Sequence, residues 1–319
     1  MQTEHTPSRA EIEHAASLLR AGKLVAFPTE TVYGLGANAL DEAAVRRIYE
    51  VKGRPSSSPI IVHVSSLEMA QTVVAEWPPK AQLLAKSFWP GPLTLVLKKQ
   101  PTISPVITAG LDTVGVRMPR DITALRLIAA VKVPIATPSA NRFTELSPTT
   151  AKHVRAGLGD RVDYILDGGR CKVGIESTVL SLVDDQPVLL RYGGVQLLLI
   201  QRKIGPVRIH TEVPDEAHLA PGMFPKHYSP RTALLLCVNG NVPRQGRGAY
   251  LQLRTPPAAE VRETVQMADA AAGYAHDLYR VLHDLDVKGY DWIAVEAPPP
   301  SEEWRAVWDR LWRARHRAG

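Results

Sequence analysis

Short apolar runs alternate with helical patterns along the first two hundred residues, and this alternation limits the fold more than any other feature. The apolar runs are LVAF (24–27), PIIVHV (59–64), TLVL (94–97), VGVRM (114–118), VPIA (133–136), YIL (164–166) and TVLSLV (178–183). Ser8 with Glu11 matches a capping box ahead of one helix, and Asp41 is placed to cap another. Such alternation is typical of an α/β sheet and does not suit a helical bundle or a β-sandwich.

A polar, proline-rich stretch divides the chain. It runs through VRIHTEVPDEAHLAPGMFPKHYSP (207–230) and reads as a linker. A shorter series follows it, with TALLLCV (232–238), GAYLQL (248–253), a helical pattern over 274–285, DWIAVEA (291–297) and a last helix. We therefore predict a large α/β domain over residues 1–207, a linker over 208–230 and a small βαβ-like domain over 231–319.

The charge balance favours anionic partners. The 319 residues carry a formal net charge of +6, which suits nucleotide, RNA or membrane phosphate without choosing among them. The amino terminus lacks the basic and apolar blocks of a signal peptide, and no apolar run is long enough to span a bilayer. The two cysteines, Cys171 and Cys237, form no CxxC motif, so neither a disulfide framework nor a cysteine zinc site is indicated. We expect a cytoplasmic protein without membrane association.

The loop KGRPSSSPI (52–60) connects a predicted helix to a predicted strand and raises the question of which anion it binds. No GxxxxGK[ST] occurs, so a P-loop is excluded. Gly34 and Gly36 belong to a GxGxxA match that does not open directly off its strand, and a tight turn explains these glycines as well. Lys52 and Arg54 can converge on one polyanion, but the loop by itself fits a solvated basic turn equally well.

Several other segments combine small hydroxyl residues, prolines and single arginines between apolar runs. They are FPTETVYGLG, FWPGPLTLVL, TAGLDTVGVRMPR, IATPSANRF, LSPTTAKHV, DGGRCKVGIESTVL and LLRYGG. Together with KGRP and SPIIVHV, they resemble, in order and spacing, the YrdC-like or threonylcarbamoyl-AMP synthase family. The later PGM and KHYSP segments and the small domain resemble the longer, two-domain branch of that family. The resemblance implies a twisted, open mixed sheet with helices, followed by the linker and the small Rossmann-like domain.

The resemblance also implies a reaction. L-Threonine, bicarbonate and ATP, the last with Mg²⁺, would give threonylcarbamoyl-adenylate and pyrophosphate, and a separate tRNA threonylcarbamoyl transferase would use the product on the adenosine next to the anticodon. Such chemistry needs positioning and charge neutralisation more than a covalent nucleophile. The sequence agrees, because it contains no GxSxG elbow and suggests no cysteine–histidine pair.

Site residues carry over position by position from the matching motifs. By resemblance, the L-threonine pocket comprises Thr31, His63, Arg117, Thr137 and Ser177. By resemblance, the ATP-binding residues are Lys52, Arg54, Ser58, Thr113, Ser139, Asn141, Ser147, Arg191 and Tyr228. Lys52 and Arg54 are assigned to the phosphates as the catalytic pair, and no metal ligand is predicted in the chain.

Some positions depart from the family pattern. Ser58 stands where asparagine is usual, so its phosphate contact would run through water, and Thr137 stands where alanine is common. Tyr192 replaces a usual proline, and Pro225 interrupts the step before KHYSP. In this branch the linker folds over the nucleotide as a lid, a role that we assign to Tyr228.

Two other functions remain open at this point. A basic α/β surface can bind double-stranded RNA or tRNA without turnover, although no RNA-binding signature occurs. In the last helix Trp304, Trp308, Leu311 and Trp312 share a face beside several arginines, a spacing that indicates core packing before RNA stacking or partner docking. A carbamoyl-transferring relative like the module of hydrogenase-maturation proteins ranks third, because the cysteine zinc motifs of those proteins are missing.

Overall fold

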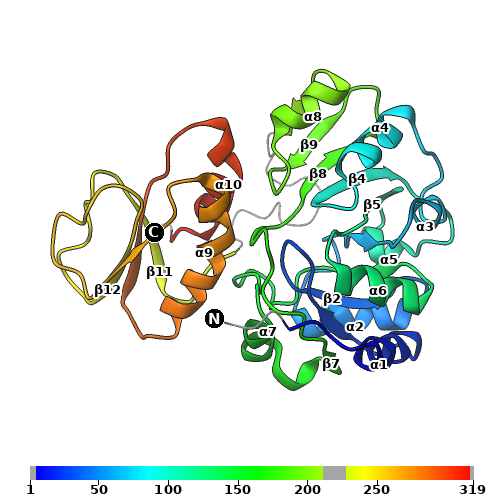
Figure 1. The fold of residues 1–319 in the computed structure, drawn as a ribbon, viewed down its shortest axis with the longest axis horizontal. Coiled ribbons are helices and arrows are strands. Elements are labelled where there is room, and N and C mark those ends of the chain that lie inside the picture. The colour runs from blue at the N-terminus through cyan, green and yellow to red at the C-terminus, as the bar shows by residue number, and fades with distance from the viewer. Residues whose placement is uncertain (1–4, 211–227, 317–319) are drawn as a thin grey trace.

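The molecule contains two β-sheets, each packed against helices. The computed structural model describes residues 5–210 and 228–316. Over these residues, ten strands form one mixed sheet and four strands form a second, smaller one. Figure 1 shows the small sheet at one end of the molecule, with the larger sheet and its helices at the other. The predicted α/β class is therefore confirmed.

The larger sheet mixes parallel and antiparallel neighbours. Its strands are β1 (Val25–Phe27), β2 (Gly34–Asn38), β3 (Val62–His63), β4 (Leu93–Lys98), β5 (Thr113–Arg117), β6 (Ile135–Ala136), β7 (Tyr164–Ile165), β8 (Thr178–Ser181), β9 (Val188–Arg191) and β10 (Arg208–Ile209). They lie in the order β10-β9-β8-β4-β5-β3-β6-β2-β1-β7. Parallel pairing joins β3 to β5 and β4 to β8, whereas β4 and β5 are antiparallel.

Helices connect these strands, and two of them begin where the sequence predicts a cap. They are α1 (Arg9–Arg20), α2 (Glu42–Lys52), α3 (Leu67–Gln71), α4 (Pro79–Phe88), α5 (Pro105–Thr108), α6 (Ile122–Val131), α7 (Ala151–Leu158) and α8 (Leu197–Ile204). The capping box of Ser8 and Glu11 is present, and the Asp41 side chain accepts a hydrogen bond from the backbone N–H of Ala44. Both helix starts are thus confirmed.

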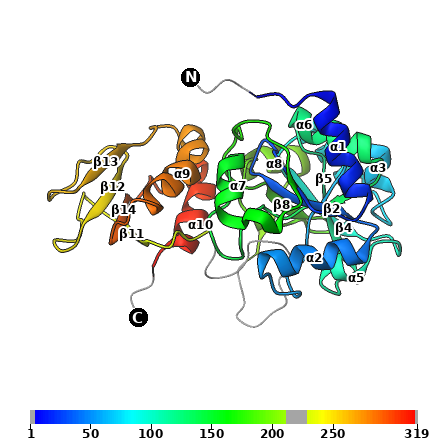
Figure 2. The same ribbon diagram turned by 90° about the horizontal axis from the view of Figure 1, so that it is seen from below.

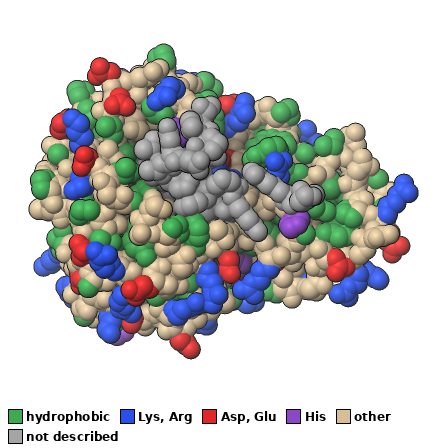
Figure 3. Space-filling model, turned by 180° about the vertical axis from the view of Figure 1, so that it is seen from behind, with side chains coloured by type: hydrophobic (Ala, Val, Ile, Leu, Met, Phe, Trp, Pro, Cys, Tyr) green, Lys and Arg blue, Asp and Glu red, His purple; other side chains and the backbone are tan. Residues whose placement is uncertain are grey.

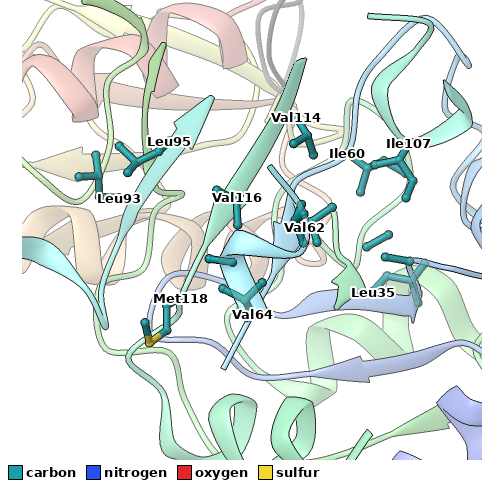
Figure 4. Packing of buried hydrophobic residues seen from close by; sticks show 14 of the residues in the cluster. Leu35, Ile60, Val62, Val64, Leu93, Leu95, Ile107, Val114, Val116 and Met118 are labelled. Carbon is teal, nitrogen blue, oxygen red and sulfur yellow. The ribbon is translucent and has the colours of Figure 1, made fainter. Parts of the chain in front are cut away.

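Alternating side chains along β1 place a core on each face of the sheet. Val25 and Phe27 pack with α1 and α6, whereas Ala26 belongs to the cluster that contains α2. Figure 4 shows the second cluster from close by, with Leu95 of β4 and Val116 of β5 among its buried side chains. Because helices cover both faces, the strands are apolar along most of their length rather than alternating with polar residues.

The smaller sheet is fully parallel and shares its core with the larger domain. Its strands are β11 (Ala233–Cys237), β12 (Gly248–Gln252), β13 (Glu263–Gln266) and β14 (Trp292–Glu296), in the order β11-β14-β12-β13. In Figures 1 and 2, helices α9 (Ala271–Asp286) and α10 (Arg305–Ala314) lie between this sheet and the larger domain. Val32, Leu146 and Ile175 of the larger domain belong to the hydrophobic cluster of the small one.

The structure corrects four details of the sequence interpretation. Gly34 and Gly36 lie in β2, not in a turn, and a Cβ on Gly34 would lie 2.3 Å from Cγ2 of Thr137, so the glycine permits a close approach of neighbouring segments. The sequence pattern missed β13. The larger sheet extends through β10 to Ile209, beyond the predicted boundary at residue 207. The last helix does not bury all its aromatic residues, because Trp312 is 51% exposed.

Most of the predicted linker lies outside the described residues. Pro225 is among the residues outside the description. Within the part of the chain that the structure describes, no helix is long and apolar enough to cross a membrane. Figure 3 shows the back of the molecule, where Lys and Arg side chains are interspersed with Asp and Glu around the edge.

Candidate active site

One cavity brings together nine of the predicted site residues. It has a volume of about 50 Å³ and lies where loops and strand ends of the larger sheet meet Tyr228. The predicted threonine residues that line it are Thr31, His63, Arg117, Thr137 and Ser177. The predicted ATP residues that line it are Arg54, Ser139, Arg191 and Tyr228. Residues from both predicted substrate pockets therefore face the same space.

Strand pairing places two of these residues side by side. His63 ends β3 and Arg117 ends β5, and the parallel register pairs the two residues directly. Thr137 follows β6, where its hydroxyl donates to the backbone oxygen of Ile135 over 3.1 Å. Because neighbouring residues in a parallel register project from the same face, His63 and Arg117 form one wall of the cavity.

The Arg117 guanidinium is already neutralised within the protein. Its Nη2 lies 2.8 Å from Oε1 of Glu30 in a buried ion pair. Its Nε donates to the backbone oxygen of Gly91 over 3.2 Å, and its Nη1 donates to the hydroxyl of Thr31 over 3.0 Å. A guanidinium has five N–H donors, so these contacts fix its orientation and leave donors for a ligand carboxylate.

His63 is a buried, neutral imidazole. Burial, and secondarily the charge of Arg117, hold the pKa of His63 well below its usual value. Its Nδ1 atom has no hydrogen-bond partner among the described residues. A neutral ring adds no positive charge beside Arg117, and it offers the cavity either a donor or an acceptor nitrogen.

Ser177 connects the threonine side of the cavity to Arg191. Its hydroxyl shares a hydrogen bond of 2.8 Å with Thr94 and accepts another from Nη2 of Arg191 over 3.1 Å. Its backbone oxygen accepts from Nε and Nη2 of Arg191 over 3.1 and 2.9 Å. These contacts fix the guanidinium at the carboxyl end of β9.

Two arginines of the predicted ATP site face the cavity from different elements. Arg54 follows α2 and donates to Ser58 and, over 2.9 Å, to the backbone oxygen of Pro59. Burial lowers the pKa of Arg54 to about 10, and the like charge of Arg191 contributes in the same direction. Two buried cations that repel each other across a cavity are stabilised when a polyanion enters between them.

Five other predicted residues do not line the cavity. Lys52 is the last residue of α2, and its ammonium donates to the backbone oxygens of Ser139 and Asn141. Asn141 donates to the backbone oxygens of Arg142 and Glu145. Ser58 is fully buried beside Arg54, Ser147 is fully buried beside Glu176, and Thr113 lies at the opposite end of β5 from Arg117.

Lys52 therefore lies inside the protein rather than on a solvated loop. It is 3% exposed, and burial, reinforced by the charge of Arg54, holds the pKa of Lys52 well below its usual value. Its two carbonyl contacts fix the loop that carries Ser139 into the cavity. The predicted helix-to-strand connection is confirmed, but the picture of a basic surface turn is wrong.

Tyr228 closes one side of the cavity and is 1% exposed. Its backbone has a φ of 60°, in the left-handed region that tyrosine rarely adopts. Its ring packs 6.0 Å from the ring of Tyr279, and the guanidinium of Arg310 lies 5.1 Å from its centre. Tyr228, near the end of the predicted linker, thus lies between the two domains.

Sequence reasoning missed three buried charged residues. Glu30 neutralises Arg117, and Glu176, which lines the cavity, accepts hydrogen bonds from Ser147, Tyr279 and Arg310. Both glutamates are next to predicted site residues in the sequence, which was the only available signal. Nothing local distinguishes Arg310 from the other arginines of the last helix, because its burial depends on docking of the two domains.

The donor set offers no resident metal site. Among residues 5–210 and 228–316, no group of three or more His, Cys, Asp or Glu side chains is placed to hold a metal ion. Glu30 and Glu176, the carboxylates beside the cavity, are both paired with arginines.

Comparisons with known proteins identify both parts of the chain. The family model described as "Telomere recombination" matches residues 17–193, and the model described as "Threonylcarbamoyl-AMP synthase, C-terminal domain" matches residues 195–315. The threonylcarbamoyl-AMP synthase of Pyrococcus abyssi is 43% identical, over 95% of this chain and 94% of that protein. The threonylcarbamoyl-AMP synthase of Bacillus subtilis is 42% identical, over 95% of this chain and 92% of that protein.

The fold agrees with a solved relative. The crystal structure of P. abyssi Sua5 complexed with L-threonine superposes with a TM-score of 0.89 and 41% identity, covering 98% of this chain and 97% of that one. A fold match of this extent includes the small domain as well as the large one. The chain belongs to the two-domain threonylcarbamoyl-AMP synthase family.

Proposed function

We propose that this cavity binds L-threonine and ATP side by side and joins them, through bicarbonate, into threonylcarbamoyl-adenylate with release of pyrophosphate. The family supports the activity, and one observation supports the site: five predicted threonine residues and four predicted ATP residues line a single cavity. In this reaction the threonine amine attacks the carbon of bicarbonate and water leaves, which gives a carbamate. A carbamate oxygen then attacks the α-phosphorus of ATP. The pyrophosphate leaves with the electron pair of the broken P–O bond.

The threonine half of the site is held by Arg117 and His63. The remaining N–H groups of Arg117 bind the threonine carboxylate, while Thr31 and Glu30 fix the guanidinium. His63, kept neutral by burial, contacts the side-chain hydroxyl or the amine of the substrate. Thr137 and Ser177 complete this pocket, so an amino acid without a hydroxyl would leave buried polar groups unpaired.

The ATP half of the site is held by Arg54, Arg191 and Ser139. The two arginines neutralise the phosphates and the charge that develops during transfer, because both are fixed by backbone carbonyls before substrate arrives. Lys52 acts on the phosphates through the Ser139 loop that it fixes. Tyr228 covers the nucleotide and excludes water from the adenylate.

Mg²⁺ enters as part of the ATP substrate in this proposal. The paired state of Glu30 and Glu176 supports this, since neither carboxylate is available as a direct ligand without losing its arginine. When bound, the ion supplies charge neutralisation for the phosphates. The chain's own contribution is to orient the two substrates and to exclude water.

The product requires a further enzyme. A mixed anhydride of a carbamate and AMP is reactive, so we infer that a tRNA threonylcarbamoyl transferase consumes it in the compartment where it is made, which we take to be the cytoplasm. Tyr228 lines the cavity, which supports the proposal that it shields the adenylate from water until the transferase takes it. Weak contact with the tRNA would assist the transfer but is not needed for the synthesis.

The test is to incubate the protein with labelled bicarbonate, ATP and Mg²⁺, with and without L-threonine. We expect pyrophosphate and a labelled adenylate only when threonine is present. L-Serine serves as a matched substrate control, because it keeps the hydroxyl and lacks the methyl group. Pyrophosphate release that is indifferent to threonine would refute the proposal, and salt-dependent tRNA binding without turnover would favour the RNA-binding alternative.

A further inference from the structure

The small domain reaches the cavity through one buried residue of its last helix. Arg310 of α10 is 1% exposed, and its Nε donates to Oε2 of Glu176 over 2.7 Å. Its guanidinium also lies over the ring of Tyr228. Glu176 and Tyr228 line the cavity, whereas Arg310 lies behind them.

We propose that Arg310 is a positioning residue for the reaction, which fixes Glu176 and the Tyr228 ring and so makes the small domain part of the ATP site. The inference rests on the proposed function. It assigns a role to a domain whose sequence suggests none, because the residue that matters acts across the domain boundary.

Glu176 is the junction of three elements. Its Oε1 accepts the hydroxyl of Ser147 over 2.5 Å, and its Oε2 accepts the hydroxyl of Tyr279 of α9 over 3.1 Å as well as the Arg310 contact. Two of these three donors come from the small domain. Movement of α9 and α10 away from the larger domain would therefore release the carboxylate.

The contact with Glu176 limits what Ser147 can offer a ligand. A hydroxyl has one proton, and Ser147 donates its proton to the carboxylate. Its oxygen can then only accept a hydrogen bond, which suits a ribose hydroxyl or a base amino group and does not suit a phosphate. Ser147, which does not line the cavity, therefore fixes Glu176 rather than binding a phosphate.

Arg310 also controls the charge near the phosphates. Burial acts to raise the pKa of Glu176, but Arg310 and Arg191 outweigh it and hold that pKa below its usual value, so the carboxylate is ionised at neutral pH. Without Arg310, the carboxylate would be left with Arg191 as its cationic neighbour. It would then compete with the phosphates for that guanidinium.

The alternative is that the pair only stabilises the domain interface. A buried ion pair replaced by neutral side chains of similar volume commonly keeps or gains stability. The double variant Glu176→Gln/Arg310→Met therefore separates the two roles, because the amide oxygen of the introduced glutamine can still accept from Ser147 and Tyr279. An interface control is Arg170→Met, which removes the interdomain pair of Arg170 with Asp277, a residue pair that does not line the cavity.

The experiment measures thermal unfolding and steady-state kinetics of each variant. We expect the double variant to melt near the native temperature with KM for ATP raised about tenfold or more and KM for threonine nearly unchanged. Arg310→Lys, which keeps the charge but not the planar group, should lie between native and Arg310→Met. Arg170→Met should keep the native KM for ATP. A folded double variant with native KM for ATP would overturn the proposal.

Two further measurements keep the test decisive. If the double variant does not fold, Tyr279→Phe removes one donor to Glu176, and an unchanged KM for ATP in that variant would refute the positioning role. If the native protein releases no threonine-dependent pyrophosphate, the proposed function fails on its own. ATP affinity measured by titration then still decides whether Arg310 positions the nucleotide site.

Discussion

The guanidinium of Arg117 and the carboxylate of Glu30 lie 2.8 Å apart and are both almost fully buried. Glu30 also accepts a hydrogen bond from the backbone N–H of Arg120 over 3.0 Å. Glu30→Gln would leave the Arg117 charge buried without a counter-charge, which typically costs about 3–5 kcal/mol. We therefore expect a lower free energy of unfolding, measured by urea denaturation at neutral pH.

The matched control for this prediction is Glu76→Gln. Glu76 pairs with Lys98 on the surface, where both side chains are more than half exposed. We expect no measurable change in unfolding, because solvent screens such pairs. Equal stability of Glu30→Gln and Glu76→Gln would show that the buried pair contributes nothing to the fold.

Arg54→Gln should reduce kcat/KM for ATP. The variant loses a charged donor at the cavity, and charged hydrogen bonds are worth about 1.5–3 kcal/mol, which corresponds to about a 10- to 150-fold loss in kcat/KM for ATP. We expect KM for threonine to change little, because we propose that Arg54 binds ATP and not threonine. The measurement is pyrophosphate release at varied ATP.

Arg46→Gln is the control on the same helix. Arg46 lies on the exposed face of α2, where it pairs with Glu42. Native kinetics are expected for it, since it does not line the cavity. If Arg54→Gln were folded and fully active, the ATP site would have to lie elsewhere.

The sequence pattern predicted the fold well where local signals were strong. Capping by Ser8 and Asp41 and the apolar runs gave correct helices and most strands, because these features depend on neighbouring residues. Strand β13 carries an alternation of half-buried and exposed residues, and β2 contains two glycines, so neither resembles a buried strand in the sequence.

The site was predictable only in part for a different reason. The family motifs named the nine residues that line the cavity, but they did not distinguish them from residues such as Lys52 that hold a loop from behind. Glu30 and Arg310 gain their roles from contacts 87 and 134 positions away in the sequence, where Arg117 and Glu176 stand. No local pattern encodes such contacts.

Two histidines stacked across the domain interface predict a pH dependence of stability. The rings of His153 and His283 lie 4.0 Å apart, from α7 and α9. Burial, followed by the charge of His283, lowers the pKa of His153 to about 3, and burial also lowers the pKa of His283. Lys152, Arg170 and Arg280 also face His153 and act in the same direction, while Asp284 and Asp286 partly offset the shift at His283.

The sign follows from the depressed pKa values. Both rings are neutral in the folded protein, whereas in the unfolded chain they take up protons near a pKa of about 6.5. Their contribution to stability is therefore complete above that pH and decreases as the pH falls toward the folded pKa values. We expect the melting temperature to decrease as the pH is lowered below about 6.5. The decrease should be less steep in the double variant His153→Gln/His283→Gln. Identical pH profiles would exclude this pair as the cause.

Gly174→Ala should separate the two domains. Gly174 has a φ of 83°, and a Cβ at this position would lie 2.5 Å from the backbone oxygen of His276 in α9. The larger side chain would force α9 away from the larger domain, releasing Tyr279 from Glu176 and raising KM for ATP together with a loss of stability. Thermal melts and ATP kinetics on the same sample measure both effects.

Gly157→Ala in α7 is the control, and we expect it to cause no loss of stability or of ATP affinity. Gly157 is the penultimate residue of α7, and a Cβ there would meet nothing within 4 Å. Alanine is favoured over glycine in a helix by at most about 0.5–1 kcal/mol, and by less in the last turn, so this variant should melt at or slightly above the native temperature with native kinetics. If both glycine variants behaved alike, the close approach of Gly174 to α9 would not be what holds the domains together. A loss confined to Gly174→Ala would instead tie interdomain docking to ATP binding, as the contacts of Glu176 require.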